Sequence, residues 1–127
     1  MMTKELDKAR REAEKRRVDE VARHMFLCIG PDCISEKEGE RLWSHLKKRV
    51  SDVQETCPEG RIYRTKVGCL RICEQGATAV VYPEGTWYGG LGKDEIDRVV
   101  EEHLVGGRPV RELVIGESNT PGARRAD

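Results

Sequence analysis

The stretch RIYRTKVGCLRICEQG, residues 61–76, contains the pattern on which both the fold and the site depend. Its first part, residues 61–67, alternates in polarity and is rich in branched and aromatic residues, which is typical of a β-strand. Gly68 ends this strand, and Cys69 and Cys73 follow with three residues between them. The sequence therefore predicts a strand that leads into a loop with a pair of cysteines.

A second stretch, HMFLCIGPDC at residues 24–33, repeats this arrangement. Its apolar run over residues 24–29 is ended by a Gly-Pro pair, which indicates a buried strand leading into a loop. Cys28 and Cys33 lie at the end of the run, with four residues between them. Because loops that leave adjacent strands on the same side lie together, the two pairs could place four sulfur atoms around one centre.

The remaining elements complete a small mixed domain. Ser35, with a glutamate three residues later, is a capping-box pattern that predicts a helix over 36–52. Residues 79–82 and 86–88 predict a hairpin around a Pro-Glu-Gly turn, and a last helix is expected over 94–104. The predicted fold class is α+β, with a central sheet of about four strands flanked by helices.

Three regions are expected along the 127 residues. Residues 1–23 are rich in charge, with a thin apolar stripe, and predict a partly ordered helical extension that leans on the domain. Residues 24–115 form the single folded domain. Residues 116–127 have almost nothing to bury, which predicts a disordered tail.

Charge and hydropathy exclude several classes of function. The 23 Lys and Arg residues balance 23 Asp and Glu residues, whereas a dedicated nucleic-acid binder normally has a basic excess. No apolar run approaches the roughly 18 residues that a membrane span needs, and the first residues lack the apolar core of a signal peptide. We therefore expect a cytoplasmic protein that binds neither membrane nor nucleic acid.

Five cysteines in such a chain indicate metal binding or redox chemistry, since the cytosol keeps structural disulfides reduced. A thioredoxin-type dithiol needs a Cys-x-x-Cys motif, which is absent from the sequence. A Rieske centre needs two histidines in the cysteine loops, and a plant-type ferredoxin needs a cysteine where Glu36 stands. Spacing leaves structural zinc and another type of 2Fe-2S cluster open, with zinc the weaker choice because zinc knuckles are tighter.

Some side chains near these motifs are expected to have other roles. Cys57 has no paired partner in the sequence and is expected to be a free thiol outside the site, although a mobile loop could let it replace a lost ligand. Arg71 lies between two cysteines, and its positive charge could favour the reduced, more negative form of a cluster bound there. His45 and His103 are expected to be packing residues. Gly30, Gly68 and Gly76 could let main-chain N–H groups approach cluster sulfurs.

The region 24–115 resembles the thioredoxin-like 2Fe-2S ferredoxins, also called the Shethna-type ferredoxins, and is more distantly similar to the iron–sulfur subunit of respiratory NADH dehydrogenase. The resemblance rests on four motifs, which are HMFLC at 24–28, GCLRICEQG at 68–76, VVYPEGTWYG at 80–89 and VEEHLVGGRPV at 100–110.

The resemblance implies a thioredoxin-like fold that is not an enzyme and carries one electron at a time. It implies that Cys28, Cys33, Cys69 and Cys73 bind a single 2Fe-2S cluster, that redox proteins are the partners, and that the free protein is a homodimer. The short first loop is closer to that of the dehydrogenase subunit, and the charged N-terminal segment has no counterpart in the family pattern. A subunit or accessory module of a flavin-dependent oxidoreductase is therefore an alternative, as is a zinc or regulatory domain.

Overall fold

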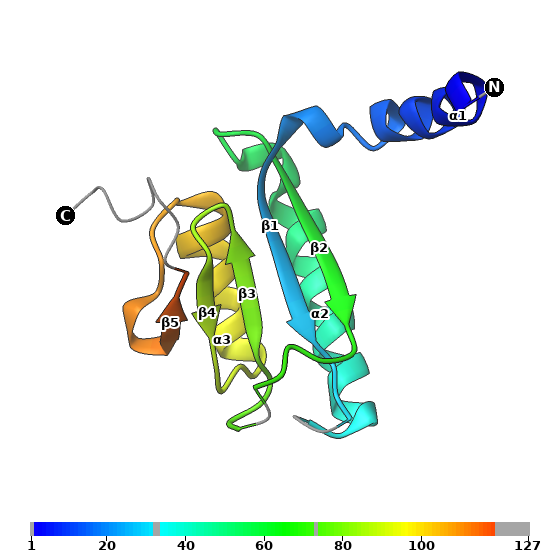
Figure 1. The fold of residues 1–127 in the computed structure, drawn as a ribbon. Coiled ribbons are helices and arrows are strands. Elements are labelled where there is room, and N and C mark those ends of the chain that lie inside the picture. Colours follow the sequence, from blue (N-terminus) through cyan, green and yellow to red (C-terminus); the bar gives the residue numbers. More distant parts are fainter. Residues whose placement is uncertain (1, 32–33, 73, 119–127) are drawn as a thin grey trace.

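The computed structural model describes residues 2–31, 34–72 and 74–118, and it contains a five-stranded sheet. The strands lie in the order β2-β1-β3-β4-β5 (Figure 1). Their bounds are β1 Val21–Cys28, β2 Arg61–Val67, β3 Ala79–Tyr82, β4 Thr86–Tyr88 and β5 Val114–Glu117. β1 and β2 are parallel, and the other neighbouring pairs are antiparallel.

Two helices cover one face of this sheet (Figure 1). Helix α2, Glu36–Val53, lies behind β1 and β2, and α3, Lys93–Arg98, lies behind β3 and β4 and continues as a π-helix over Val99–Val105. Short 3-10 turns occur at Val18–Glu20, Gln54–Thr56 and Arg111–Leu113. The α+β class and the predicted helix and hairpin positions are confirmed.

The sheet has one strand more than the expected four. Residues 116 and 117, which we assigned to the tail, belong to β5, which pairs with β4. The Ser118 N–H continues this contact by donating to the Gly85 carbonyl at 2.8 Å. β5 is short and only half-buried, so its pairing with β4, rather than its own apolar content, makes it a strand. Residues 119–127 of the predicted tail lie outside the described residues.

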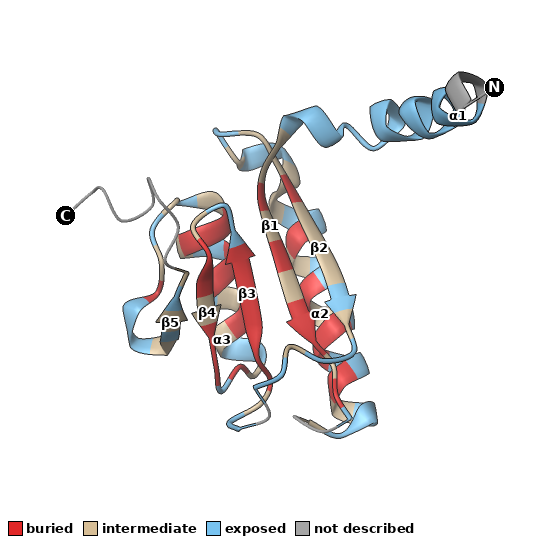
Figure 2. Cartoon of the chain, viewed as in Figure 1, coloured by how far each residue is buried: buried red, intermediate tan, exposed pale blue. Residues whose placement is uncertain are grey.

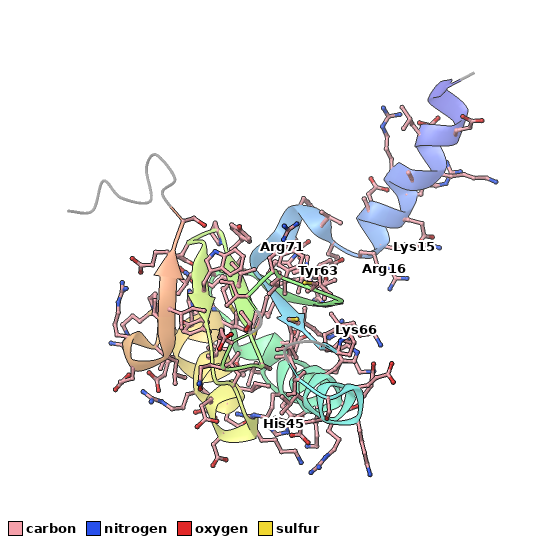
Figure 3. The ribbon with its side chains drawn as sticks, turned by 60° about the horizontal axis from the view of Figure 1, so that its bottom comes forward. Lys15, Arg16, His45, Tyr63, Lys66 and Arg71 are labelled. Atoms are coloured by element: carbon pink, nitrogen blue, oxygen red, sulfur yellow. The ribbon has the colours of Figure 1, made fainter. Side chains whose placement is uncertain are left out.

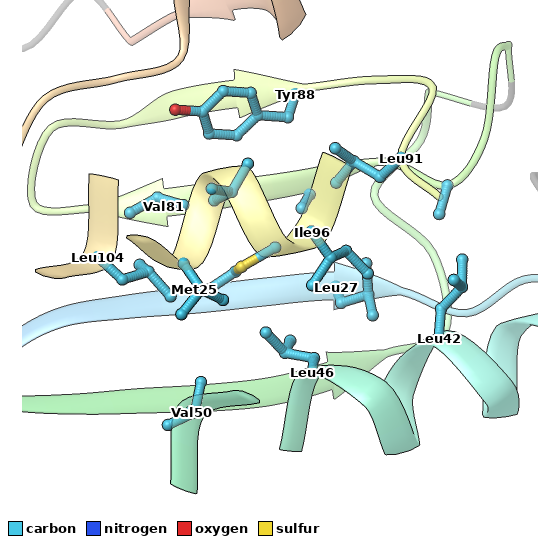
Figure 4. Packing of buried hydrophobic residues seen from close by; sticks show 14 of the residues in the cluster. Met25, Leu27, Leu42, Leu46, Val50, Val81, Tyr88, Leu91, Ile96 and Leu104 are labelled. Carbon is cyan, nitrogen blue, oxygen red and sulfur yellow. The ribbon is translucent and has the colours of Figure 1, made fainter. Parts of the chain in front are cut away.

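The core lies between the sheet and the two helices (Figures 2 and 4). Period-two alternation directs Met25 and Leu27 of β1 to this side, where they meet apolar side chains from α2 and α3. Their buried neighbours include Leu42, Leu46, Val50, Val81, Tyr88, Leu91, Ile96 and Leu104. The pairing register therefore leaves the opposite face to other side chains. The opposite face of the sheet carries the ring contacts of His24. Its ring stacks on the Phe26 ring, with the ring centres 4.1 Å apart, and lies edge-on to the Tyr63 ring, with the ring centres 5.3 Å apart.

The N-terminal segment is helical, as predicted, but the helix does not lean on the domain. Helix α1, Met2–Lys15, projects from the domain, and its described side chains are exposed (Figure 2). Its connection to the sheet lies at its C-terminal end, where the Tyr63 hydroxyl donates to the Arg16 carbonyl at 2.7 Å (Figure 3). The extension therefore meets the domain beside strand β2.

A buried polar chain crosses the end of the sheet where β1 begins. The Val110 N–H donates to the Tyr88 hydroxyl at 2.9 Å, and this hydroxyl lies 2.8 Å from His103 Nδ1. His103 Nε2 lies 3.0 Å from a Glu84 carboxylate oxygen, and Arg23 donates to the same carboxylate. Burial lowers the pKa of His103, so the ring is neutral at pH 7 and donates from Nε2 to Glu84.

The same surroundings shift the pKa values of Tyr88 and Glu84 in this hydrogen-bonded network. Burial raises the pKa of Tyr88 to about 12, so its hydroxyl keeps the proton that it donates to His103. Burial alone would raise the pKa of Glu84, but hydrogen bonds from Arg23 and His103 lower it below the ordinary value. His103 is thus a satisfied packing histidine, as expected. His45, which lies 2.8 Å from an Asp97 carboxylate oxygen, is another.

Tyr88→Phe should lower the free energy of unfolding by about 2–3 kcal/mol, because two buried groups each lose a hydrogen-bond partner. Urea unfolding followed by far-ultraviolet circular dichroism measures the change. Tyr82→Phe is the matched control, since Tyr82 is 41% exposed, and its effect should stay below about 0.5 kcal/mol. Equal effects of the two substitutions would show that the buried hydrogen bonds of the Tyr88 hydroxyl contribute no stability.

Candidate metal centre

Parallel pairing brings the ends of β1 and β2 to the same edge of the sheet. Cys28 is the last residue of β1 and pairs with Val67, the last residue of β2, so Cys69 follows only two residues beyond that pair. The Cys28 Sγ lies 3.9 Å from the Gly68 carbonyl oxygen. The expectation that the cysteine loops leave adjacent strands on the same side is confirmed for Cys28 and Cys69.

The two sulfur positions differ in their environment. Cys28 is 2% exposed, and its N–H donates to the Thr78 carbonyl at 2.8 Å. Cys69 is exposed. The candidate site thus has a buried side at Cys28 and a solvent-exposed side at Cys69. This arrangement suits a bound group that a partner protein must be able to approach.

Close backbone packing shapes the loop after Cys28. Gly30 has a φ of +89°, and a Cβ there would lie 2.1 Å from the Ile34 carbonyl oxygen. Ser35 caps α2, because its Oγ accepts from the Glu38 N–H at 3.2 Å, as the sequence predicts. Gly39, in the first turns of α2, lies against the backbone of Ile29, where a Cβ would be 2.4 Å from the carbonyl oxygen. Two glycines therefore let the loop and the helix approach each other next to Cys28.

The loop after Cys69 supplies a main-chain donor to sulfur. The Arg71 N–H lies 3.2 Å from the Cys69 Sγ. Arg71 reaches this position with a φ of +71°, a left-handed conformation that is uncommon for residues other than glycine. We expected such a donor near Gly30, Gly68 or Gly76; Arg71 was missed because nothing in the sequence signals a left-handed arginine. Gly68 itself faces open space, since a Cβ there would meet nothing within 4 Å.

Cys33 and Cys73, the other two predicted ligands, lie outside the described residues. Among the residues that the structure describes, no three His, Cys, Asp or Glu side chains are grouped as a metal site. The ligand roles of all four cysteines therefore stay predictions. The described half of the set has thiol donors, which suit an iron–sulfur cluster, and a main-chain donor to sulfur and an exposed side, which influence the potential of such a cluster.

Cys57 lies at the other end of the sheet. It precedes β2, is half-buried, and has its Sγ 3.6 Å from the Leu104 carbonyl oxygen. The seven residues of β2 put about 20 Å between this end and the cysteine edge. Cys57 is thus outside the site, as predicted, but the idea that it could replace a lost ligand does not fit this distance.

Comparisons with known proteins place this site in context. No family model matches the chain. The 2Fe-2S ferredoxin of Aquifex aeolicus (strain VF5) is 32% identical over 112 residues, covering 79% of this chain and 95% of that protein. The 2Fe-2S ferredoxin of Clostridium pasteurianum is 31% identical over 99 residues, covering 72% of this chain and 94% of that protein.

A comparison with solved structures identifies the fold. The thioredoxin-like [2Fe-2S] ferredoxin from Aquifex aeolicus matches with a TM-score of 0.64 at 30% identity, covering 79% of this chain and 96% of that structure. The class of protein that the fold defines is therefore a thioredoxin-like domain, and this chain has Cys28 and Cys69 at one edge of its sheet. The chain belongs to the thioredoxin-like 2Fe-2S ferredoxin family, as its motifs predict. Ferredoxins are electron carriers and not enzymes.

Proposed function

We propose that this protein carries single electrons on one 2Fe-2S cluster bound by Cys28, Cys33, Cys69 and Cys73. The observation that supports the proposal is the parallel pairing of β1 and β2, which brings Cys28 and Cys69 of a ferredoxin family member to one edge of the sheet. When bound, such a cluster supplies an iron pair that can accept and return one electron.

The protein's own residues would set how readily that electron is accepted. The Arg71 N–H donates to the Cys69 Sγ, and a main-chain donor to a ligand sulfur stabilises added negative charge. Cys69 is exposed and Ile72, in the same loop, is 37% exposed. An exposed loop with an apolar side chain would let a redox partner approach closely, because electron transfer weakens steeply with distance.

The charge of the Arg71 side chain should raise the reduction potential, because Arg71 is an exposed cation two residues from Cys69. Arg71→Gln keeps the N–H donor and removes the charge, so the potential should fall by roughly 10–60 mV. Arg71→Lys is the control and should stay within about 10 mV. Protein-film voltammetry measures both values, and equal potentials for the two variants would contradict a role for the charge.

Analysis of the anaerobically purified protein tests the function. Iron and inorganic sulfide should each be near two per chain, as in a 2Fe-2S cluster. Visible absorption should bleach on addition of dithionite. A colourless protein with zinc would instead support a structural or regulatory zinc domain and overturn the proposal.

Three finer features are part of the proposal. We expect redox proteins as partners, a homodimer in solution and a cytoplasmic location. Among the described helices, none is both long and apolar enough to cross a bilayer. Light scattering coupled to size-exclusion chromatography tests the homodimer, since a monomer mass would contradict it.

The four-residue spacing of Cys28 and Cys33 favours one alternative function, a module of a flavin-dependent oxidoreductase. Stable co-purification with a flavoprotein would support this alternative.

A further inference from the structure

A groove runs along the outer side of β2, between the C-terminal end of α1 and helix α2. Its volume is about 730 Å³. Among the described strands β2 pairs with β1 alone, so β2 is an edge strand and the groove follows its open side. Lys15 and Arg16 form one wall, and the other wall comes from α2. Figure 3 shows Lys15, Arg16 and Tyr63 where the extension meets the domain.

The groove is strongly basic. The cations that line it are Lys15, Arg16, Lys47, Arg61 and Arg64. Glu55 is the one carboxylate among the described lining residues. This excess contrasts with the balanced charge of the whole chain, and it makes the groove complementary to an anionic partner.

Two of these cations rest on an aromatic side chain, and a third is incompletely satisfied. Lys47 and Arg64 lie 5.9 Å and 5.4 Å from the centre of the Trp43 ring, which positions them on the α2 side of the groove. Arg61 has a buried Nε that lacks a hydrogen-bond partner among the described residues. An anion in the groove would give this Nε a hydrogen-bond acceptor.

On the open side of β2, the main-chain groups of Ile62 are already hydrogen-bonded to a side chain. The Gln54 side chain donates to the Ile62 carbonyl at 3.0 Å and accepts from the Ile62 N–H at 2.7 Å. One side-chain amide thus makes the two hydrogen bonds that a neighbouring strand would make. Because main-chain groups alternate in direction along a strand, Arg64 and Lys66 direct theirs to the same open side.

We propose that this groove binds an extended acidic segment of a partner protein, which adds to the sheet as a strand beside β2. Its main chain would pair with Arg64 and Lys66, and its carboxylates would meet the five cations. An alternative role for cations on an edge strand is protection against aggregation. That role requires neither a groove lined by five cations nor a buried Arg61 Nε without a partner, so the observations favour binding. The proposal goes beyond electron transfer, and binding can be measured without it.

Fluorescence anisotropy with a labelled ten-residue polyglutamate peptide tests the proposal on the full-length, cluster-loaded protein. The peptide should bind in 50 mM NaCl and weaken at least about tenfold in 300 mM NaCl. Arg16→Glu/Lys47→Glu/Arg64→Glu should weaken it by at least about tenfold. The control Lys37→Glu/Lys48→Glu/Lys93→Glu changes net charge equally on exposed lysines elsewhere and should stay within about twofold.

Further measurements separate this proposal from its competitors. A ten-residue polyglutamate peptide with every main-chain nitrogen methylated keeps the length and the charge, and it should bind at least about fivefold more weakly because it has no N–H group to donate to β2. Equal binding of the two peptides, or equal loss in both triple variants, would overturn strand addition at this groove. Inorganic phosphate that displaced the peptide at matched ionic strength would indicate a phosphate site instead. Visible absorption and circular dichroism confirm that each variant is folded and loaded, so a failure here is distinguishable from failure of the electron-carrier proposal.

Discussion

Cys28→Ala should abolish cluster binding, with iron falling from about two per chain to a small fraction of one. Cys28 is buried at the end of β1, where it pairs with Val67 of β2 on one side and donates its N–H to the Thr78 carbonyl on the other. Alanine provides no ligand atom, unlike serine. The chain around position 28 cannot shift to present another donor without breaking the pairing of β1.

Cys57→Ala is the control for this prediction. Cys57 packs at the far end of β2, about 20 Å from the cysteine edge, so its removal should leave iron, sulfide and the visible spectrum unchanged. Iron and sulfide analysis with visible absorption measures both variants. A Cys28→Ala protein with a full cluster would show that Cys28 is not a ligand or that another residue replaces it. The double variant would then show whether Cys57 is that residue.

Local sequence patterns were sufficient for the parts of the fold that depend on local structure. The strand over residues 61–67, the Ser35 cap and the helix after it are confirmed because each rests on a few neighbouring residues. β5 was missed because its strand character comes from pairing with β4, which no window around residue 114 reveals. The start of β1 at Val21, three residues before the expected start, has the same cause, since it pairs there with Arg61 of β2.

Long-range contacts were beyond sequence reasoning for a similar reason. The polar chain through Arg23, Glu84 and His103 joins three distant segments, and no motif marks it. The Arg71 donor to the Cys69 Sγ depends on a backbone conformation that favours glycine over arginine. The cysteine positions did predict that Cys28 and Cys69 lie at one edge of the sheet, because this requires only two adjacent strand ends. The order of the strands, which makes β2 an edge, was needed to recognise the basic groove.

Gly39→Ala tests how tightly α2 packs against the cysteine edge. In an exposed helix this substitution would stabilise by up to about 1 kcal/mol, because alanine is the better helix former. Gly39 is buried, however, and its added Cβ would lie 2.4 Å from the carbonyl oxygen and 3.0 Å from the carbonyl carbon of Ile29. These are backbone atoms, so no side-chain rotation can relieve the clash. The start of α2 or the loop after Cys28 must move.

We therefore expect Gly39→Ala to lower the free energy of unfolding by about 2–3 kcal/mol and to reduce the iron content. Both effects have one cause, because Ile29 follows Cys28 directly and any displacement of its backbone reaches the buried thiol. Gly68→Ala is the matched control: Gly68 precedes Cys69, yet a Cβ there meets nothing within 4 Å, so stability and iron content should be nearly unchanged. Urea unfolding and iron analysis measure both variants. If Gly39→Ala matches Gly68→Ala in stability and iron, the packing of α2 on Ile29 does not hold the first cysteine loop, and pairing of β1 with its neighbours must position Cys28 alone.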